Sequence, residues 1–139
     1  MTRIAISADD YGLSPGVSSA IIALADADRL SGTGCMTVFP WWPEQACAIA
    51  PLLDRIDVGV HLTLTDHAPL GAMPILAPSG RMPSPGQLFR KAIIGAIDPA
   101  EIKAELHRQI DAFEAALGRP PAFLDSHHPA HQFPRIRNL

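Results

Sequence analysis

Apolar and polar positions form two kinds of pattern along the chain. Short runs rich in β-branched and apolar residues predict four strands, at residues 3–8, 32–39, 57–64 and 120–126. Between them lie segments whose apolar residues recur at helical spacing, at residues 17–30, 43–55, 84–97 and 98–118. Strands that alternate with helices indicate βαβ units with right-handed crossovers, and hence a parallel sheet.

Capping residues predict where the helices begin and end. Ser14 stands directly before a proline and can cap the first helix, and Gly32 is expected to stop it. Asp98 is the expected cap of the longest helix, with Glu101 at its capping-box position and Gly118 at its end. The longest helix therefore carries signals at both of its ends.

A long segment without periodicity, residues 65–86, follows the third predicted strand. It is dense in proline and glycine. Compact domains seldom keep a structureless segment of this length without a use, so we expect a functional loop or lid. Its apolar residues, such as Leu70, Met73 and Ile75, are candidates for covering a ligand or contacting a second subunit.

The length of the chain limits the architecture. Its 139 residues, 47% of them hydrophobic, can build one globular core. A complete (β/α)₈ barrel needs about 250 residues. We therefore expect one α/β domain over residues 1–139 with a parallel-sheet, barrel-like (β/α) fold. This fold would be about the first half of a barrel, truncated at the C-terminus, or else a small open sheet.

Charge and cysteine usage narrow the class of protein. The formal net charge is −3 and the 11 Lys and Arg residues are scattered, so we expect no nucleic-acid partner. The N-terminal apolar run is cut short by two acids, which fits neither a signal peptide nor a membrane span. We therefore expect a cytoplasmic protein with no membrane partner. Cys35 and Cys47 stand apart, without a C-x-x-C pair, and are expected to be reduced core residues.

Carboxylates and imidazoles gather where the predicted strands end. Two aspartates follow the first strand, a histidine lies near the end of the third, and one aspartate and three histidines lie at or after the end of the fourth. The carboxyl ends of parallel strands share one edge of a sheet, where α/β proteins hold ligands and catalytic groups. The residues expected to converge there are Asp9, Asp10, His61, Asp125, His127, His128 and His131.

Two imidazoles and one carboxylate would suit a divalent cation, with zinc, manganese, iron or magnesium as candidates. Asp9 and Asp10 should face opposite ways on an extended backbone, so one can bind the cation while the other meets a bound water. This division suits metal-assisted hydrolysis, in which the cation lowers the pKa of water from 15.7 to about 7 and a carboxylate removes the proton. Two structural alternatives stay open: the acidic pair as a loop or cap, and His61 as a buried, hydrogen-bonded imidazole.

The other histidines are weaker candidates. His127 and His131 have the i, i+4 spacing of helical zinc sites, but a proline lies between them, so we expect a shaped loop. His128 adjoins His127 and should face elsewhere. His67 and His107 are expected in a loop or at the surface, with His107 on the exposed side of the longest helix.

Three segments resemble, in order, motifs of the YdjC family, also called the ChbG-type carbohydrate deacetylases. They read ISADDYGLSPGVSSAII, VGVHLTLTDHAPL and FLDSHHPAHQFPRI, and the resemblance runs from about Arg3 to Ile136. It implies a metal-dependent enzyme that removes acetyl groups from N-acetylated sugars such as chitooligosaccharides, on a barrel-like (β/α) fold. Pro129 departs from the pattern, since the family usually has another histidine there.

The resemblance also implies roles for individual residues. By position, Asp10, His61 and His127 match the family's metal ligands. Asp9 matches the neighbouring aspartate, which is the expected general base. Asp125 would orient a ligand imidazole through its other ring nitrogen.

These observations lead to three hypotheses. In the first, a metal-activated water, deprotonated with help from Asp9, attacks the acetyl carbonyl of an N-acetylated sugar, and His131 is a candidate acid for the leaving amine. In the second, the chain is an inactive metal-binding remnant that self-associates as a dimer, because an incomplete barrel leaves an unpaired strand edge. A metal-dependent phosphoesterase is less favoured, because no arginine or glycine-rich phosphate cradle adjoins the site.

Overall fold

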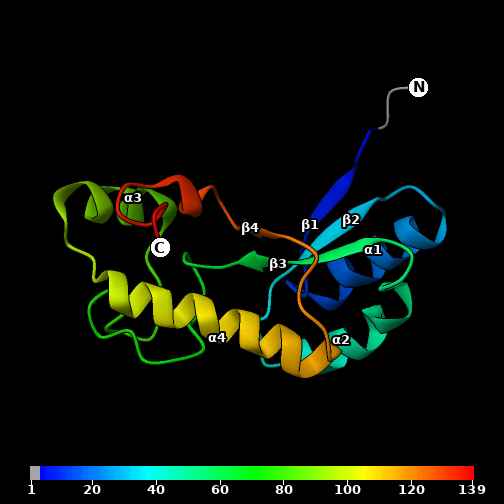
Figure 1. Ribbon diagram of the computed structural model, residues 1–139. Coiled ribbons are helices and arrows are strands. Elements are labelled where there is room, and N and C mark those ends of the chain that lie inside the picture. The colour runs from blue at the N-terminus through cyan, green and yellow to red at the C-terminus, as the bar shows by residue number, and fades with distance from the viewer. Residues whose placement is uncertain (1–3) are drawn as a thin grey trace.

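A sheet of four parallel strands organises the molecule in the computed structural model, which describes residues 4–139. Its strands lie side by side in sequence order (Figure 1), and they are β1 (Ser7–Tyr11), β2 (Gly32–Cys35), β3 (Asp57–Leu62) and β4 (Leu124–Ser126). Consecutive order and parallel pairing are the arrangement of a (β/α) barrel wall. The expected α/β fold with a barrel-type parallel sheet is therefore confirmed. Residue 3, the expected start of the first strand, lies outside the described residues.

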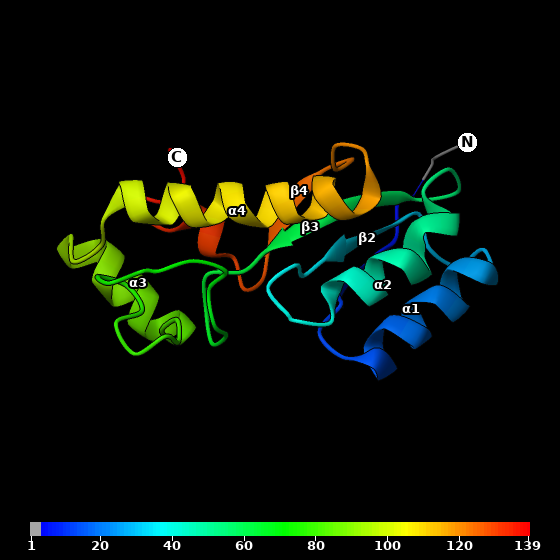
Figure 2. The same cartoon turned by 90° about the horizontal axis from the view of Figure 1, so that it is seen from below.

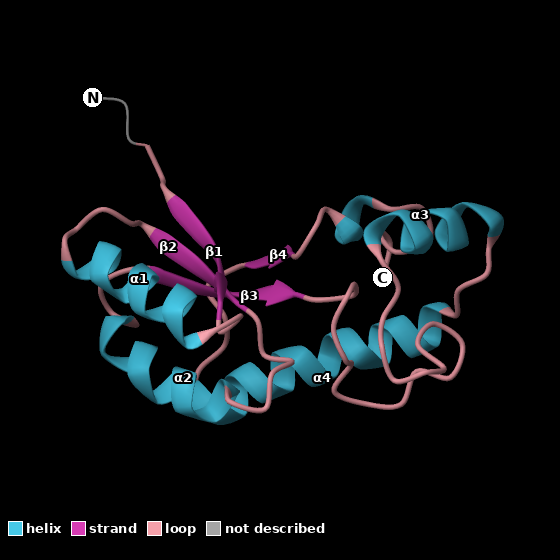
Figure 3. Cartoon of the chain, turned by 180° about the vertical axis from the view of Figure 1, so that it is seen from behind, coloured by secondary structure: helices cyan, strands magenta, loops and turns pink. Residues whose placement is uncertain are grey.

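Helices cover one face of this sheet. Figures 1 and 3 show α1 (Pro15–Asp26), α2 (Trp42–Ile49) and α4 (Pro99–Leu117) on the same side of the sheet. Figure 2 shows α3 (Pro85–Ile94) beyond the sheet, next to the start of α4. Short 3₁₀ helices lie at Ala50–Leu52 and Ala130–Gln132. Among residues 4–139, no helix combines the length and apolar character needed to cross a membrane.

Most of the predicted capping residues act at the helix ends. The Ser14 hydroxyl accepts a hydrogen bond from the amide three residues on, and the Asp98 carboxylate accepts one from the amide two residues on. Gly118 ends α4 with a φ of 69°, in the left-handed region that glycine tolerates best. Gly32 does not stop the first helix, because α1 already ends at Asp26 and Gly32 begins β2.

Two hydrophobic cores share the longest helix. One lies between the sheet and helices α1, α2 and α4, and the other lies between α3, the start of α4 and the segment 65–86. With 19 residues, α4 is about 28 Å long and reaches both. Its fully buried Phe113 packs in the first core and its fully buried Ile102 in the second.

The segment 65–86 contains no helix or strand before α3 begins at Pro85, yet it packs as a layer on α4. Met73 is only 2% exposed and belongs to the second core, whereas Leu70 and Ile75 are exposed. Glu101 accepts two backbone hydrogen bonds from this segment, at 2.8 and 2.9 Å, and Glu105 accepts two more. Glu101 therefore anchors the segment instead of closing a capping box, and Met73 is not free to cover a ligand.

The two cysteines have different environments. Cys35 on β2 is fully buried, as expected. Cys47 is exposed, so its assignment to the core was wrong. The reason is the orientation of α2, which turns Trp42, Ala46 and Ile49 toward the core and leaves Cys47 on the outer side.

Candidate metal centre

Both aspartates of the acidic pair lie inside β1 rather than after it. The pairing with β2 shifts between Ala8 and Tyr11, which indicates a β-bulge, and Asp10 has a left-handed φ of 66°. Aspartate tolerates this conformation better than most residues. The two aspartate side chains were expected to face opposite ways because an extended backbone was assumed. The backbone is not extended at Asp10, and both Asp9 and Asp10 approach His61.

Three segments far apart in the sequence each contribute one residue to a compact set of possible cation ligands. Asp10 comes from β1, His61 from β3, and His127 from the loop directly after β4. Asp10 Oδ1 lies 3.3 Å from His61 Nε2 and 2.9 Å from His127 Nδ1. One ligand atom from each of the three residues lies within 4.8 Å of the others. The structure thus brings together the three residues predicted to bind a cation.

The His61 ring is held from its other side by Asp125. The two residues face each other in the pairing of β3 with β4, and Nδ1 lies 2.8 Å from Asp125 Oδ1. This contact leaves Nε2 directed at Asp10. Gly34 provides the space for the pair, since a Cβ there would lie 3.0 Å from Asp125 Oδ1 and 3.2 Å from His61 Nδ1.

A second grouping places the remaining aspartate beside the centre. Asp9, His61 and Asp125 also have ligand atoms within 4.8 Å of one another. His61 is common to both groupings, and its Nδ1 already bonds to Asp125. The first set is therefore the better cation site, and Asp9 is an exposed carboxylate at its border.

The two central imidazoles have opposite electrostatic environments. Burial lowers the pKa of His61, but the hydrogen bond and charge of Asp125, together with the charge of Asp10, raise it above its ordinary value. For His127, burial lowers the pKa; the charge of Asp10 raises it, the neighbouring His128 lowers it further, and the net shift is downward. His127 is therefore the readier neutral ligand, and protons compete for His61.

Donor chemistry and spacing both fit a small divalent cation. Zinc lies about 2.0–2.2 Å from nitrogen and oxygen ligands, which puts tetrahedral ligand atoms about 3.3 Å apart. The distances of Asp10 Oδ1 to the two imidazoles, 2.9 and 3.3 Å, match this spacing. Three protein ligands leave coordination positions for substrate and water, which is the pattern of catalytic rather than structural sites.

Of the other two histidines after β4, His128 lies in a turn and His131 in the short 3₁₀ helix Ala130–Gln132, so no α-helix spans this segment, as the prolines predict. His131 is exposed, and its Nδ1 lies 2.6 Å from the Ser126 hydroxyl. Within residues 4–139 it makes no hydrogen bond to the three candidate ligands. His128 has a positive φ of 47°, and its ring lies 4.1 Å from that of His127, with Nδ1 2.9 Å from the Thr65 hydroxyl.

One histidine beside the centre was missed from the sequence. The centroid of the half-buried His67 ring lies 5.8 Å from that of His127 and 4.9 Å from that of Phe39. Its pKa is lowered by burial and by His127. The sequence offered one indication of this position, because His67 follows β3 and the carboxyl ends of the strands carry the centre. His67 lies five residues beyond the end of β3, however, so its distance from the centre could not be predicted. His107 is exposed on α4, as expected.

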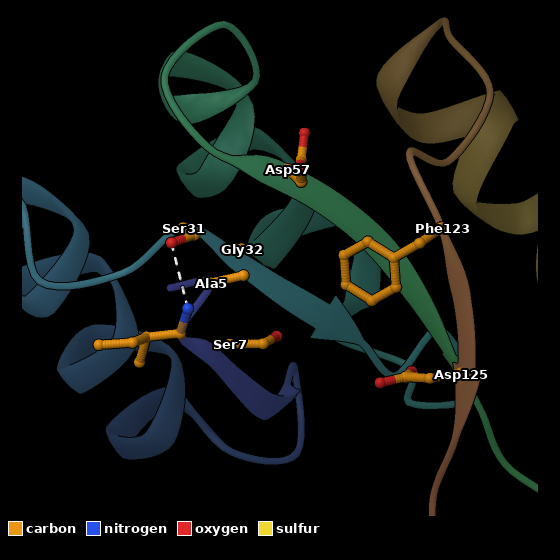
Figure 4. Close-up of a pocket in the computed structure, with 8 residues that line it drawn as sticks. Ala5, Ser7, Ser31, Gly32, Asp57, Phe123 and Asp125 are labelled. Atoms are coloured by element: carbon orange, nitrogen blue, oxygen red, sulfur yellow. Dashed lines mark hydrogen bonds between the residues drawn. The ribbon is translucent and has the colours of Figure 1, made fainter. Parts of the chain in front are cut away.

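A hollow on the open face of the sheet is separate from this centre. Figure 4 shows it at the beginnings of the strands, where Ser7, Gly32 and Asp57 start β1, β2 and β3 and Phe123 precedes β4. The candidate ligands lie at the opposite, carboxyl end of the sheet. Asp125 is the one residue that the hollow shares with the centre.

Comparison with known proteins yields relatives across nearly the whole chain. The sequence profile of the family described as YdjC-like protein matches residues 3–139. Two relatives are named chitooligosaccharide deacetylase, one from Serratia marcescens, 36% identical over 135 residues, and one from Yersinia pestis (strain Pestoides F), 35% identical over 136 residues. Both alignments cover 96% of this chain and 52% of the relative.

A solved structure supports the fold. It is a protein from Enterococcus faecalis V583 whose suggested role is cellobiose-phosphate cleavage, and it superposes with a TM-score of 0.78 at 24% sequence identity. The superposition covers 96% of this chain and 52% of that one. The chain thus spans about half the length of each of these relatives.

Proposed function

The chain belongs to the YdjC-like protein family, and we propose on this basis that it hydrolyses the acetamido group of N-acetylated sugars such as chitooligosaccharides. The two relatives named chitooligosaccharide deacetylase support a carbohydrate deacetylase. The observation that carries the proposal is the convergence of Asp10, His61 and His127 at one edge of the sheet. Two imidazoles and a carboxylate are a donor set suited to metal-assisted hydrolysis.

Asp10, His61 and His127 would hold a divalent cation, with zinc, manganese, iron and magnesium as candidates. When bound, such a cation lowers the pKa of a water molecule and polarises the acetyl carbonyl. Asp125 supports this role because its bond to Nδ1 fixes the tautomer and orientation of the His61 ring.

The chain's own acid and base groups lie around this donor set. Asp9 is an exposed carboxylate with an oxygen within 4.8 Å of a ring nitrogen of His61, and it would accept the proton of the attacking water. Loss of the acetyl group then requires a proton on the departing amine. His131 is the candidate donor, and its Nε2 is the nitrogen available for this, because Nδ1 bonds to Ser126.

Metal content and acetate release test these roles separately. Asp10→Ala and His61→Ala should lose the cation, whereas His107→Ala, which removes an exposed imidazole on α4, should keep it. Asp9→Asn should keep the cation but release acetate from chitooligosaccharides about 10²–10⁴ times more slowly, because it removes a general base. Unchanged metal content in both ligand variants would refute the ligand assignment. A bound cation without acetate release, for each of the four metals, would favour the inactive metal-binding alternative.

We also propose that the chain associates as a dimer. Within residues 4–139, β1 and β4 each have one edge without a partner strand. Apolar side chains lie exposed just before β1, with Ile4 at 78% and Ile6 at 54%, and in β4, with Leu124 at 52%. A second copy would cover the unpaired edges and their apolar side chains. Light scattering of the purified chain should give twice its 14.9 kDa mass, and a soluble monomer would contradict the proposal.

A further inference from the structure

A row of aromatic rings leads from the candidate metal centre along the edge of the sheet. The ring centroids of His61 and His127 are 5.5 Å apart, and the next step, from His127 to His67, is 5.8 Å. Two further steps of 4.9 Å lead from His67 to Phe39 and from Phe39 to Trp41. The last two rings are stacked, with their planes inclined by only 8°.

The far end of this row is fixed in place without belonging to a core. The Trp41 indole N–H donates to the Gly12 carbonyl oxygen at 2.7 Å, which ties the loop after β2 to the loop after β1. The backbone of His67 is held at both its N–H and its C=O, by bonds of 2.7 and 2.9 Å. Phe39 and Trp41 are half-buried, and neither is part of the two hydrophobic cores. Aromatic side chains held at the surface in this way are prepared for a ligand, since little freedom is lost on binding.

We propose that Phe39, Trp41 and His67 form a subsite for the sugar unit next to the one whose acetamido group lies at the metal centre. This inference rests on the proposed function. A pyranose ring has an apolar C–H face, which packs on an aromatic ring while its hydroxyl groups stay in water. His67 stands between Phe39 and His127, so the stacked pair lies beside the centre rather than on it, as a neighbouring sugar unit requires. The preferred ligand is then an oligosaccharide of at least two units.

Binding of two ligands of different length tests the subsite. By calorimetric titration, Phe39→Leu should weaken binding of di-N-acetylchitobiose about three- to tenfold, the range that an aromatic contact contributes. N-acetylglucosamine, which fills the centre alone, should lose less than twofold. His67→Ala should shift the same disaccharide preference and serves as the second variant. Phe89→Leu on α3 is the matched control, because it makes the same change on an exposed phenylalanine of another element, and its affinities should equal those of the wild type.

The outcomes separate this inference from the proposed function. If both variants, verified as folded by circular dichroism, bind the disaccharide as tightly as the wild type, the subsite is refuted. Wild-type protein that binds no disaccharide, or a loss that is equal for both sugars, also refutes it. A selective loss of disaccharide binding in protein that releases no acetate would leave the subsite standing and overturn the deacetylase proposal.

Discussion

Gly34→Ala tests whether the His61–Asp125 pair depends on the space that glycine leaves. A Cβ at this position would lie 3.0 Å from Asp125 Oδ1, 3.1 Å from His61 Cβ and 3.2 Å from His61 Nδ1. These contacts are tighter than most Cβ contacts in proteins, and both neighbours are members of the pair joined at 2.8 Å. The added methyl group must therefore push the two side chains apart by a few tenths of an ångström.

The expected effect follows from what the pair does. Inserting a methyl group into a packed site destabilises the fold by about 1–3 kcal/mol. Disturbing the partner that orients a metal-binding histidine costs about 10–100-fold in metal affinity. The pKa of His61 should also fall, because burial lowers it while the bond and charge of Asp125 raise it. The pKa of His61 is higher in the folded chain than in the unfolded chain. The His61–Asp125 pair therefore stabilises the fold fully at a pH below the ordinary histidine pKa near 6.5. This stabilisation is lost as the pH rises through the raised pKa of His61.

Three measurements check this reasoning. NMR titration of metal-free protein gives the pKa of His61, competition with a chelator gives the metal affinity, and urea unfolding gives the stability, which should drop most at acidic pH. Gly86→Ala is the matched control, because it makes the same change where no atom lies within 4 Å. In combination with Asp125→Asn, the effects of Gly34→Ala should not add, since both act through one contact. An unchanged His61 pKa together with unchanged metal affinity would refute the reasoning, and additive effects would show that Gly34 acts elsewhere.

Three further predictions concern other parts of the chain. Glu105→Ala should destabilise the fold by about 3 kcal/mol in urea unfolding, because the fully buried Glu105 accepts two backbone hydrogen bonds from segment 65–86 and pairs with Arg108. Glu105→Gln should lose less stability, and equal losses would show that the carboxylate charge matters more than its hydrogen bonds. Cys47 should react quickly with a thiol reagent in the folded protein, and Cys35 should react only after unfolding. Cys35 is buried, and its burial together with the charge of Asp125 raises the pKa of its thiol. Reaction of both cysteines at the same rate in the folded protein would contradict this. Metal affinity should fall as pH is lowered through the raised pKa of His61, and a flat profile between pH 5 and 8 would argue against His61 as a ligand.

Much of the centre was predictable because strand order in a parallel sheet is a simple rule. His61 was expected at the end of a strand and His127 just after one, and both lie where the rule puts them. The strand that carries Asp9 and Asp10 was placed too early, because its apolar residues precede the acidic pair while the hydrogen-bonded ladder includes it. A bulge has no periodicity of its own, so the sequence did not reveal that both carboxylates approach His61.

Local patterns by themselves determined the alternation of strands and helices, the capping of α1 and α4, and the edge of the sheet at which carboxylates and imidazoles meet. These features depend on neighbours within a few positions, which a sequence displays directly. Only the tertiary structure decided that Gly34 makes room for the His61–Asp125 pair and that Phe39 and His67 extend the centre into a row of rings. The physical reason is that these features are contacts between residues far apart in the chain, whose distances are set by strand register and loop packing.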